Sequence, residues 1–143
     1  MYCTLTDIKK LLPEETVIQL TDDEGLDAVN QARLDESISQ ADAEIDSYCG
    51  GRYAVPFTTV PDIVKKISID IAIYNLYSRK VEEIPETRAD RYKNAIRQLE
   101  GITKGLISIG EAEAPPASTS EGGAGTNKTE SDRTFTKDKL NGF

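Results

Sequence analysis

Two aspartates one helical turn apart are the first residues in this sequence that could do chemistry. Asp42 and Asp46 fall on one face of a predicted helix, and paired carboxylates can act as general acid and base. Such a pair needs a nucleophile or a substrate cleft beside it, and the neighbouring sequence offers neither. We therefore interpret the two carboxylates as the polar flank of a helix, engaged in structural contacts.

A third carboxylate, Asp70, has isoleucines on both sides in the most apolar segment of the chain. A buried carboxylate needs a cation or a hydrogen-bond donor beside it, because an unpaired buried charge is strongly destabilising. Arg52 and Arg79 are the candidate partners. We expect an ion pair or a tyrosine hydrogen bond there rather than catalysis, and we assign structural roles to Asp46, Arg52, Tyr53 and Asp70.

The acidic segment at residues 22–27 could hold calcium, since it contains four carboxylates and Gly25. An EF-hand loop has glycine at its sixth position, and that register would make Leu20 the first ligand. Leucine has no ligand atom. We therefore favour a solvated acidic turn whose carboxylates stabilise the start of the next helix, and we predict no metal site and no cofactor.

The composition excludes several classes of active site. The chain has 143 residues, a formal net charge of -8 and no histidine. Without histidine it can form no serine-protease triad, no cysteine–histidine dyad and no imidazole metal site. An acidic chain is also a poor nucleic-acid binder, because phosphate contacts require clustered Lys and Arg. We predict that the protein is not an enzyme.

The two cysteines, Cys3 and Cys49, are too few for a disulfide framework. We expect both to be reduced thiols. Cys49 ends a predicted helix and has no second cysteine close to it in the sequence, so a packed thiol is a better interpretation than a nucleophile.

Hydrophobic periodicity predicts an all-α fold, a small bundle of four main helices around a central helix. The helices are expected at about residues 6–12, 34–48, 61–79 and 85–104. The third is apolar nearly all round, which is typical of a central helix. Gly50 and Gly51 should end the second helix through a positive φ, and Gly105 should end the fourth. Residues 52–57 should be extended, because Pro56 disfavours an α conformation before it.

The composition divides the chain into three parts. Residues 1–110 contain nearly all the Ile, Leu and Val, enough for one helical domain. Residues 111–132 contain no Ile, Leu, Val, Phe or Tyr and are predicted to be a flexible linker. Residues 133–143, here called the docking segment, regain Phe and Leu and are basic.

The docking segment has the composition of a peptide that binds a partner protein, although a frayed end is the alternative. Its apolar side chains are expected to insert into an apolar groove of a partner, and its basic side chains to meet an acidic surface. The partner-binding residues are predicted to be Arg133, Phe135, Lys137, Lys139, Leu140 and Phe143.

The sequence AEIDSY at residues 43–48, followed by GRYAVPF at 51–57, is the most specific pattern in the chain. Together with residues 1–8, 18–22, 60–77 and 133–143, it resembles a family of Mu-like prophage structural proteins long described as of unknown function. The resemblance covers essentially the whole chain apart from the linker. Cys49 departs from the family, which often has an aliphatic residue there, and the loop at residues 22–27 is shorter than usual.

This family resembles the small helical head–tail connector, or adaptor, proteins of tailed phages. The resemblance implies a virion assembly protein that forms a ring, expected to be a dodecamer, beneath the portal protein. The ring would join the head to the tail or to a stopper protein, and DNA would pass through it without specific binding. The protein would be found in the host cytoplasm during assembly and in the virion afterwards, with no membrane involved.

Two alternatives remain open. The chain could be an intracellular protein-binding module, for example a small acidic regulator or inhibitor that acts through the docking segment. It could also be an enzyme that uses Asp42, Asp46 or Asp70, which would require a cleft and a carboxyl group with a strongly raised pKa.

Overall fold

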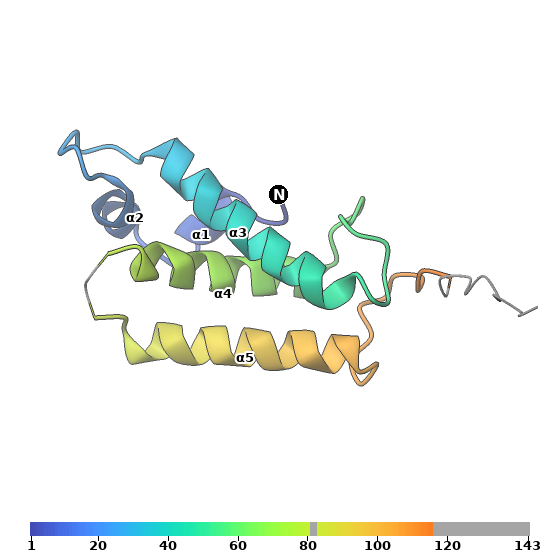
Figure 1. Cartoon of the computed structure of the whole chain (residues 1–143). Coiled ribbons are helices and arrows are strands. Elements are labelled where there is room, and N and C mark those ends of the chain that lie inside the picture. The colour runs from blue at the N-terminus through green and yellow to red at the C-terminus, as the bar shows by residue number, and fades with distance from the viewer. Residues whose placement is uncertain (81–82, 116–143) are drawn as a thin grey trace, which may run out of the picture.

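The most apolar helix of the chain, α4 (Asp62–Ser78), needs packing partners on several sides. In the computed structural model, which describes residues 1–80 and 83–115, every other helix contacts it. Figure 1 shows α5 below α4 and the remaining helices above it. The other helices are α1 (Leu5–Lys9), α2 (Glu14–Thr21), α3 (Gln31–Cys49) and α5 (Glu86–Thr103). The prediction of an all-α bundle around a central helix is confirmed.

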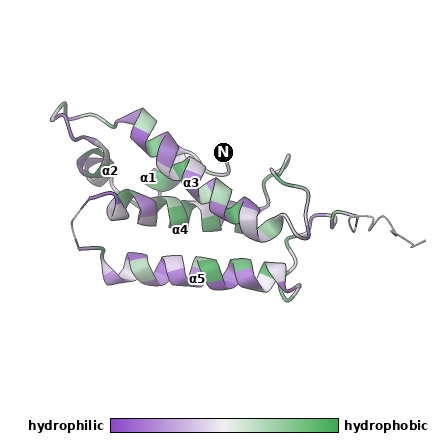
Figure 2. Cartoon of the chain, viewed as in Figure 1, coloured by the Kyte–Doolittle hydropathy of each residue, from purple (hydrophilic) through white to green (hydrophobic). Residues whose placement is uncertain are grey.

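The core is formed by the inward stripes of α3, α4 and α5. Ile45 of α3, Ile71 of α4 and Leu99 of α5 are completely buried. Figure 2 shows hydrophobic residues along α4 and a more hydrophilic α5. Because each large aliphatic side chain contributes about 2 kcal/mol when buried, packing on α4 is the main source of helix stability.

The N-terminal part of the chain differs from the prediction. Helix α1 begins at Leu5, where Thr4 caps it in a reciprocal pair with Asp7, and it ends at Lys9 rather than at residue 12. Helix α2 was not predicted. It has only eight residues, too few for a stable isolated helix, and it is held by the burial of Val17 and Leu20 against the rest of the bundle.

The end of α3 also differs. Gly50 has a right-handed helical conformation with φ -61°, so the expected positive φ is wrong. The backbone N–H groups of Arg52 and Tyr53 both donate to the Cys49 carbonyl, and the segment expected to be extended therefore starts as a turn. The prediction for Gly105 is correct: its φ is +75° just after α5.

Candidate interaction surface

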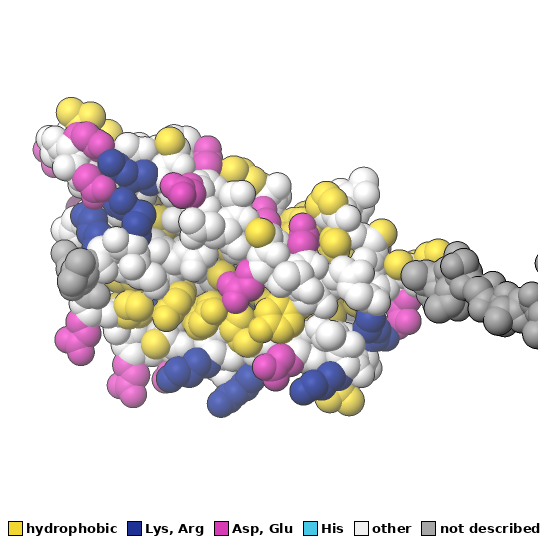
Figure 3. Space-filling view, in the orientation of Figure 1, with side chains coloured by type: hydrophobic (Ala, Val, Ile, Leu, Met, Phe, Trp, Pro, Cys, Tyr) yellow, Lys and Arg dark blue, Asp and Glu magenta, His cyan; other side chains and the backbone are white. Residues whose placement is uncertain are grey.

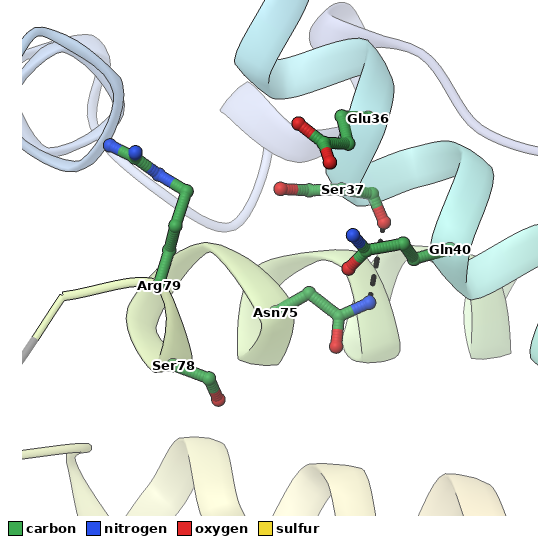
Figure 4. A pocket seen from close by; sticks show the side chains of 6 residues that line it. All are labelled: Glu36, Ser37, Gln40, Asn75, Ser78 and Arg79. Carbon is green, nitrogen blue, oxygen red and sulfur yellow. Dashed lines mark hydrogen bonds between the residues drawn. The ribbon is translucent and has the colours of Figure 1, made fainter.

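A hollow opens between α3 and the C-terminal half of α4. In Figure 1, α3 rises away from α5 towards its own N-terminal end. The hollow of about 360 Å³ beside this part of α4 is lined by Glu36, Ser37, Gln40, Asn75, Ser78 and Arg79 (Figure 4). The Asn75 amide donates to the Ser37 carbonyl at 3.3 Å and so fixes the spacing of α3 and α4 at its floor.

Two stacked tyrosines connect α4 to α5 one turn along α4 from the hollow. Tyr74 is one turn before Ser78 on α4, and its ring stacks on Tyr92 of α5 with the centroids 4.1 Å apart. The Tyr92 hydroxyl donates to the Glu44 carboxylate of α3 at 3.0 Å. Burial, helped by that carboxylate, raises the pKa of Tyr92 to about 12, so its hydroxyl remains a donor at neutral pH.

The tyrosines leave an apolar strip at the surface. Figure 3 shows hydrophobic side chains gathered along the line where α4 meets α5. Tyr92 and Ile96, which lie one turn apart on α5, are both only partly buried. The surface formed by the hollow, the two tyrosines and Ile96 is called the front groove below.

The unpaired charge in the front groove is acidic. Glu36 is exposed, and within residues 1–80 and 83–115 it forms no ion pair. Arg79, the cation at the edge of the hollow, is turned away towards α2 (Figure 4). There its guanidinium donates to Asp23 and to the Leu20 carbonyl, each at 2.9 Å. The front groove therefore combines aromatic surface with an available carboxylate.

The carboxylates of the acidic loop between α2 and α3 accept hydrogen bonds from other groups of the same chain. Asp22 accepts hydrogen bonds from the backbone N–H groups of Glu24, Gly25 and Asp27. Asp23 accepts from Arg79, and Glu24 accepts from Arg33. No group of three or more potential metal ligands occurs in the part of the chain that the structure describes. The N-cap of α3 is Asn30, while Glu24 binds Arg33 in the first turn of that helix.

Asp42 and Asp46 hold the N-terminal residues. Asp42 accepts hydrogen bonds from the Tyr2 backbone N–H at 3.0 Å and from the Ser68 hydroxyl at 3.1 Å. The Tyr2 hydroxyl donates to Asp46 and accepts from the Phe57 N–H. Burial and the Asp46 carboxylate raise the pKa of Tyr2. The pair thus ties the first residues to α3 and α4.

Asp70 is buried and ion-paired, but with partners that we did not predict. Its carboxylate accepts from Arg91 of α5 at 2.8 Å and lies 3.8 Å from Lys66. The expected partners are engaged elsewhere, Arg52 near the end of α5 and Arg79 at the acidic loop. The antiparallel packing of α4 and α5 decides this, because it brings residue 91 opposite residue 70.

Arg52 joins three separate segments. Its guanidinium donates to the Ile102 carbonyl at 2.8 Å and pairs with Glu113, while its backbone carbonyl accepts from the Ala114 N–H at 2.8 Å. A Cβ at Gly105 would lie 2.7 Å from this guanidinium. The adjacent Tyr53 is buried beside Phe57. Arg52 therefore fixes the place at which the chain leaves the bundle.

The cysteines are separate and inaccessible. Cys3 and Cys49 are both free thiols with almost no exposed surface. Burial raises the pKa of each to about 11, which opposes thiolate formation at neutral pH. These properties agree with packed thiols.

The predicted linker lies largely, and the docking segment wholly, outside the described residues. Within residues 1–80 and 83–115, no helix combines the length and apolar character needed to cross a membrane.

Comparisons with known proteins place the chain among phage proteins. The family model described as Bacteriophage Mu, Gp36 matches residues 2–127. The chain belongs to this Gp36 family. The resemblance to Mu-like prophage proteins is thus confirmed.

Two relatives agree with this family. The Mu-like prophage FluMu protein gp36 of Haemophilus influenzae is 35% identical over 97 residues, which cover 68% of this chain and 67% of that protein. Gene product J of Escherichia phage Mu is 30% identical over 94 residues, which cover 65% of this chain and 63% of that protein. The chain spans about two thirds of the length of these curated relatives.

Sequence reasoning did not predict the front groove. Tyr92 and Ile96 are one turn apart in the fourth predicted helix, a spacing typical of a core stripe, and Glu36 and Glu44 are polar positions of the second. Tyr74 and Tyr92 could have indicated a partly exposed surface, because they carry polar hydroxyls on helices whose deepest positions are aliphatic. Their contact depends on how α4 and α5 pack, and no spacing within one helix reveals it.

Proposed function

We propose that this protein is a head–tail connector, a non-catalytic adaptor that forms a ring beneath the portal protein and joins the phage head to the tail. The observation that carries the proposal is the Gp36 family match over residues 2–127. The small helical bundle agrees with the resemblance to phage connector proteins. In this proposal the partners are the portal protein, the tail or stopper protein and neighbouring copies of the chain.

The charge of the chain supports a conduit for DNA. The formal net charge is -8, and copies arranged in a ring would multiply it around the central channel. An acidic wall repels phosphates over about 10 Å at moderate salt, so DNA would pass without being held.

Carboxylate contacts support a scaffold rather than catalysis. Asp42, Asp46 and Asp70 all accept hydrogen bonds from side chains or backbone of the bundle. A general acid or base must reach a substrate, and these groups instead connect α3, α4, α5 and the N-terminal residues. We therefore assign them to stability.

Electron microscopy of particles made by a phage that lacks this gene tests the proposal. A connector is needed after DNA packaging, so we expect filled or leaking heads beside separate, complete tails. A plasmid copy of the gene should restore joined particles. Normal tailed particles from the deletion strain would contradict the proposal and favour an intracellular binding module.

A further inference from the structure

The front groove is a surface with partly exposed aromatic side chains and an exposed carboxylate. It places the stacked rings of Tyr74 and Tyr92 one turn along α4 from a hollow of about 360 Å³. Glu36 stands on its wall with no cation paired to it among the described residues. An apolar strip with acidic side chains at its edge suits a segment that carries aromatic and basic residues.

We propose that the front groove binds the docking segment, residues 133–143, of a neighbouring copy of the same chain. This inference rests on the proposed ring and names the contact that links its members. Each copy then donates one segment and receives one. Such a head-to-tail contact is heterologous, and it leaves no groove empty once the ring closes.

The chemistry of the two surfaces is complementary. The docking segment carries three basic residues together with Phe135, Leu140 and Phe143. The hollow of about 360 Å³ is large enough for one long side chain, and its polar lining suits the basic residues of the docking segment. The stacked tyrosines offer a face to a second aromatic ring, while Glu36 is available to Lys or Arg.

The point at which the chain leaves the bundle favours a neighbour over the same molecule. Arg52 holds Glu113 and Ala114 at the end of the bundle where α3 and α5 finish. The hollow lies beside the C-terminal half of α4, a helix of 17 residues and thus about 25 Å long. In Figure 1 the described chain leaves away from that half. Reaching its own groove would require the chain to turn back along the bundle.

The length of the intervening chain permits the contact. The composition of residues 116–132 predicts a flexible linker, whose root-mean-square span is about 23 Å. A linker of that span can connect two copies when the end of the bundle at which one chain leaves lies next to the front groove of the other copy. Tethering then raises the effective concentration of the docking segment at the neighbouring groove.

Photo-crosslinking of the full chain tests this contact. Benzoylphenylalanine replaces Phe135, and copies of natural isotope content are mixed with copies labelled with ¹⁵N before irradiation. We expect crosslinks to groove residues such as Gln40 and Asn75, in peptide pairs that combine a light and a heavy partner. Crosslinks confined to one isotope would show that the segment folds back on its own chain, and crosslinks elsewhere on the bundle would show that the groove is wrong. Either result would overturn the inference.

A charge exchange provides the matched control. Glu36→Lys should abolish most of these crosslinks, and Lys137→Glu with Lys139→Glu in the docking segment should restore them. Glu15→Lys, an equally exposed change on α2, should leave them unchanged. Failure of the exchange, with joined virions still dependent on the gene, would overturn the groove contact and leave the connector proposal standing.

Discussion

The two sides of α4 carry hollows of similar size but opposite character. On the side towards α1 and α5, here called the back hollow, a space of about 330 Å³ is lined by Asp7, Lys65, Lys66 and Arg91 among others. Its buried carboxylate, Asp7, is paired with Lys10 and Lys65. The front groove has a similar volume, but Glu36 there lacks a described partner.

This difference separates stability from interaction. Asp7 in the back hollow connects α1 to α4, so its loss should weaken the fold. Glu36 in the front groove connects no helices, so its loss should leave the fold intact and affect only association. Loss of Asp7 should therefore be detected in unfolding experiments, and loss of Glu36 in association experiments.

Asp7→Ala should have the largest effect on stability. The substitution removes the capping pair with Thr4 and leaves Lys65 without its partner. Lys10 and Lys65 both remain accessible to water, so neither becomes a buried unpaired charge. We therefore expect a loss of about 2 kcal/mol in the free energy of unfolding. Urea denaturation measures it, with Glu15→Ala as an exposed acidic control. A loss no larger than that of the control would show that the back hollow does not hold α1.

Acid should weaken the same contact. Burial alone would raise the pKa of Asp7, but hydrogen bonds from Thr4, Lys10 and Lys65 outweigh it and hold the pKa well below the ordinary range. The stabilisation is therefore present above the unfolded-state pKa of about 3.9 and is lost as the pH falls towards the folded-state value.

Below about pH 4, wild-type stability should thus fall more steeply than that of Asp7→Asn, which keeps the shape of the side chain but does not titrate. Urea midpoints measured across this pH range provide the comparison. Parallel slopes for the two proteins would contradict the assignment of the depressed pKa to Asp7.

Tyr92→Phe should have a smaller effect. It keeps the ring stacked on Tyr74 and removes only the hydrogen bond to Glu44, so we expect a loss of about 1 kcal/mol. Thermal unfolding followed by circular dichroism measures the change. The matched substitution Tyr77→Phe removes a side-chain hydroxyl that makes no hydrogen bond within the described residues. If both variants lost equal stability, the Glu44 contact would not link α3 to α5.

Glu36→Lys should have the smallest effect on folding, within about 0.5 kcal/mol of wild type, as exposed substitutions generally do. Self-association of the same variant, measured by sedimentation velocity on the full chain, should be weaker than that of wild type. Unchanged association would show that Glu36 does not take part in the contact between copies. It would also contradict the assignment of stability to one side of α4 and of association to the other.

The sequence alone determined the fold class and the central helix. The run of isoleucines around Asp70 makes this helix apolar nearly all round, which is typical of a helix packed by neighbours on several sides. The spacing from Leu34 to Tyr48 and the glycine at position 105 likewise act within one helix. They could be identified because hydrophobic periodicity and glycine φ are local properties of the chain.

Tertiary structure alone decided the partners of the charged groups and the shape of the surface. Asp70 could have paired with any nearby arginine, and the antiparallel packing of α4 and α5 selected Arg91. Helix α2 is too short to form by itself and depends on the surface beneath it. The hollow of the front groove lies where side chains of α3 and α4 meet. These features depend on contacts between residues far apart in the sequence, which the pattern within a single helix does not contain.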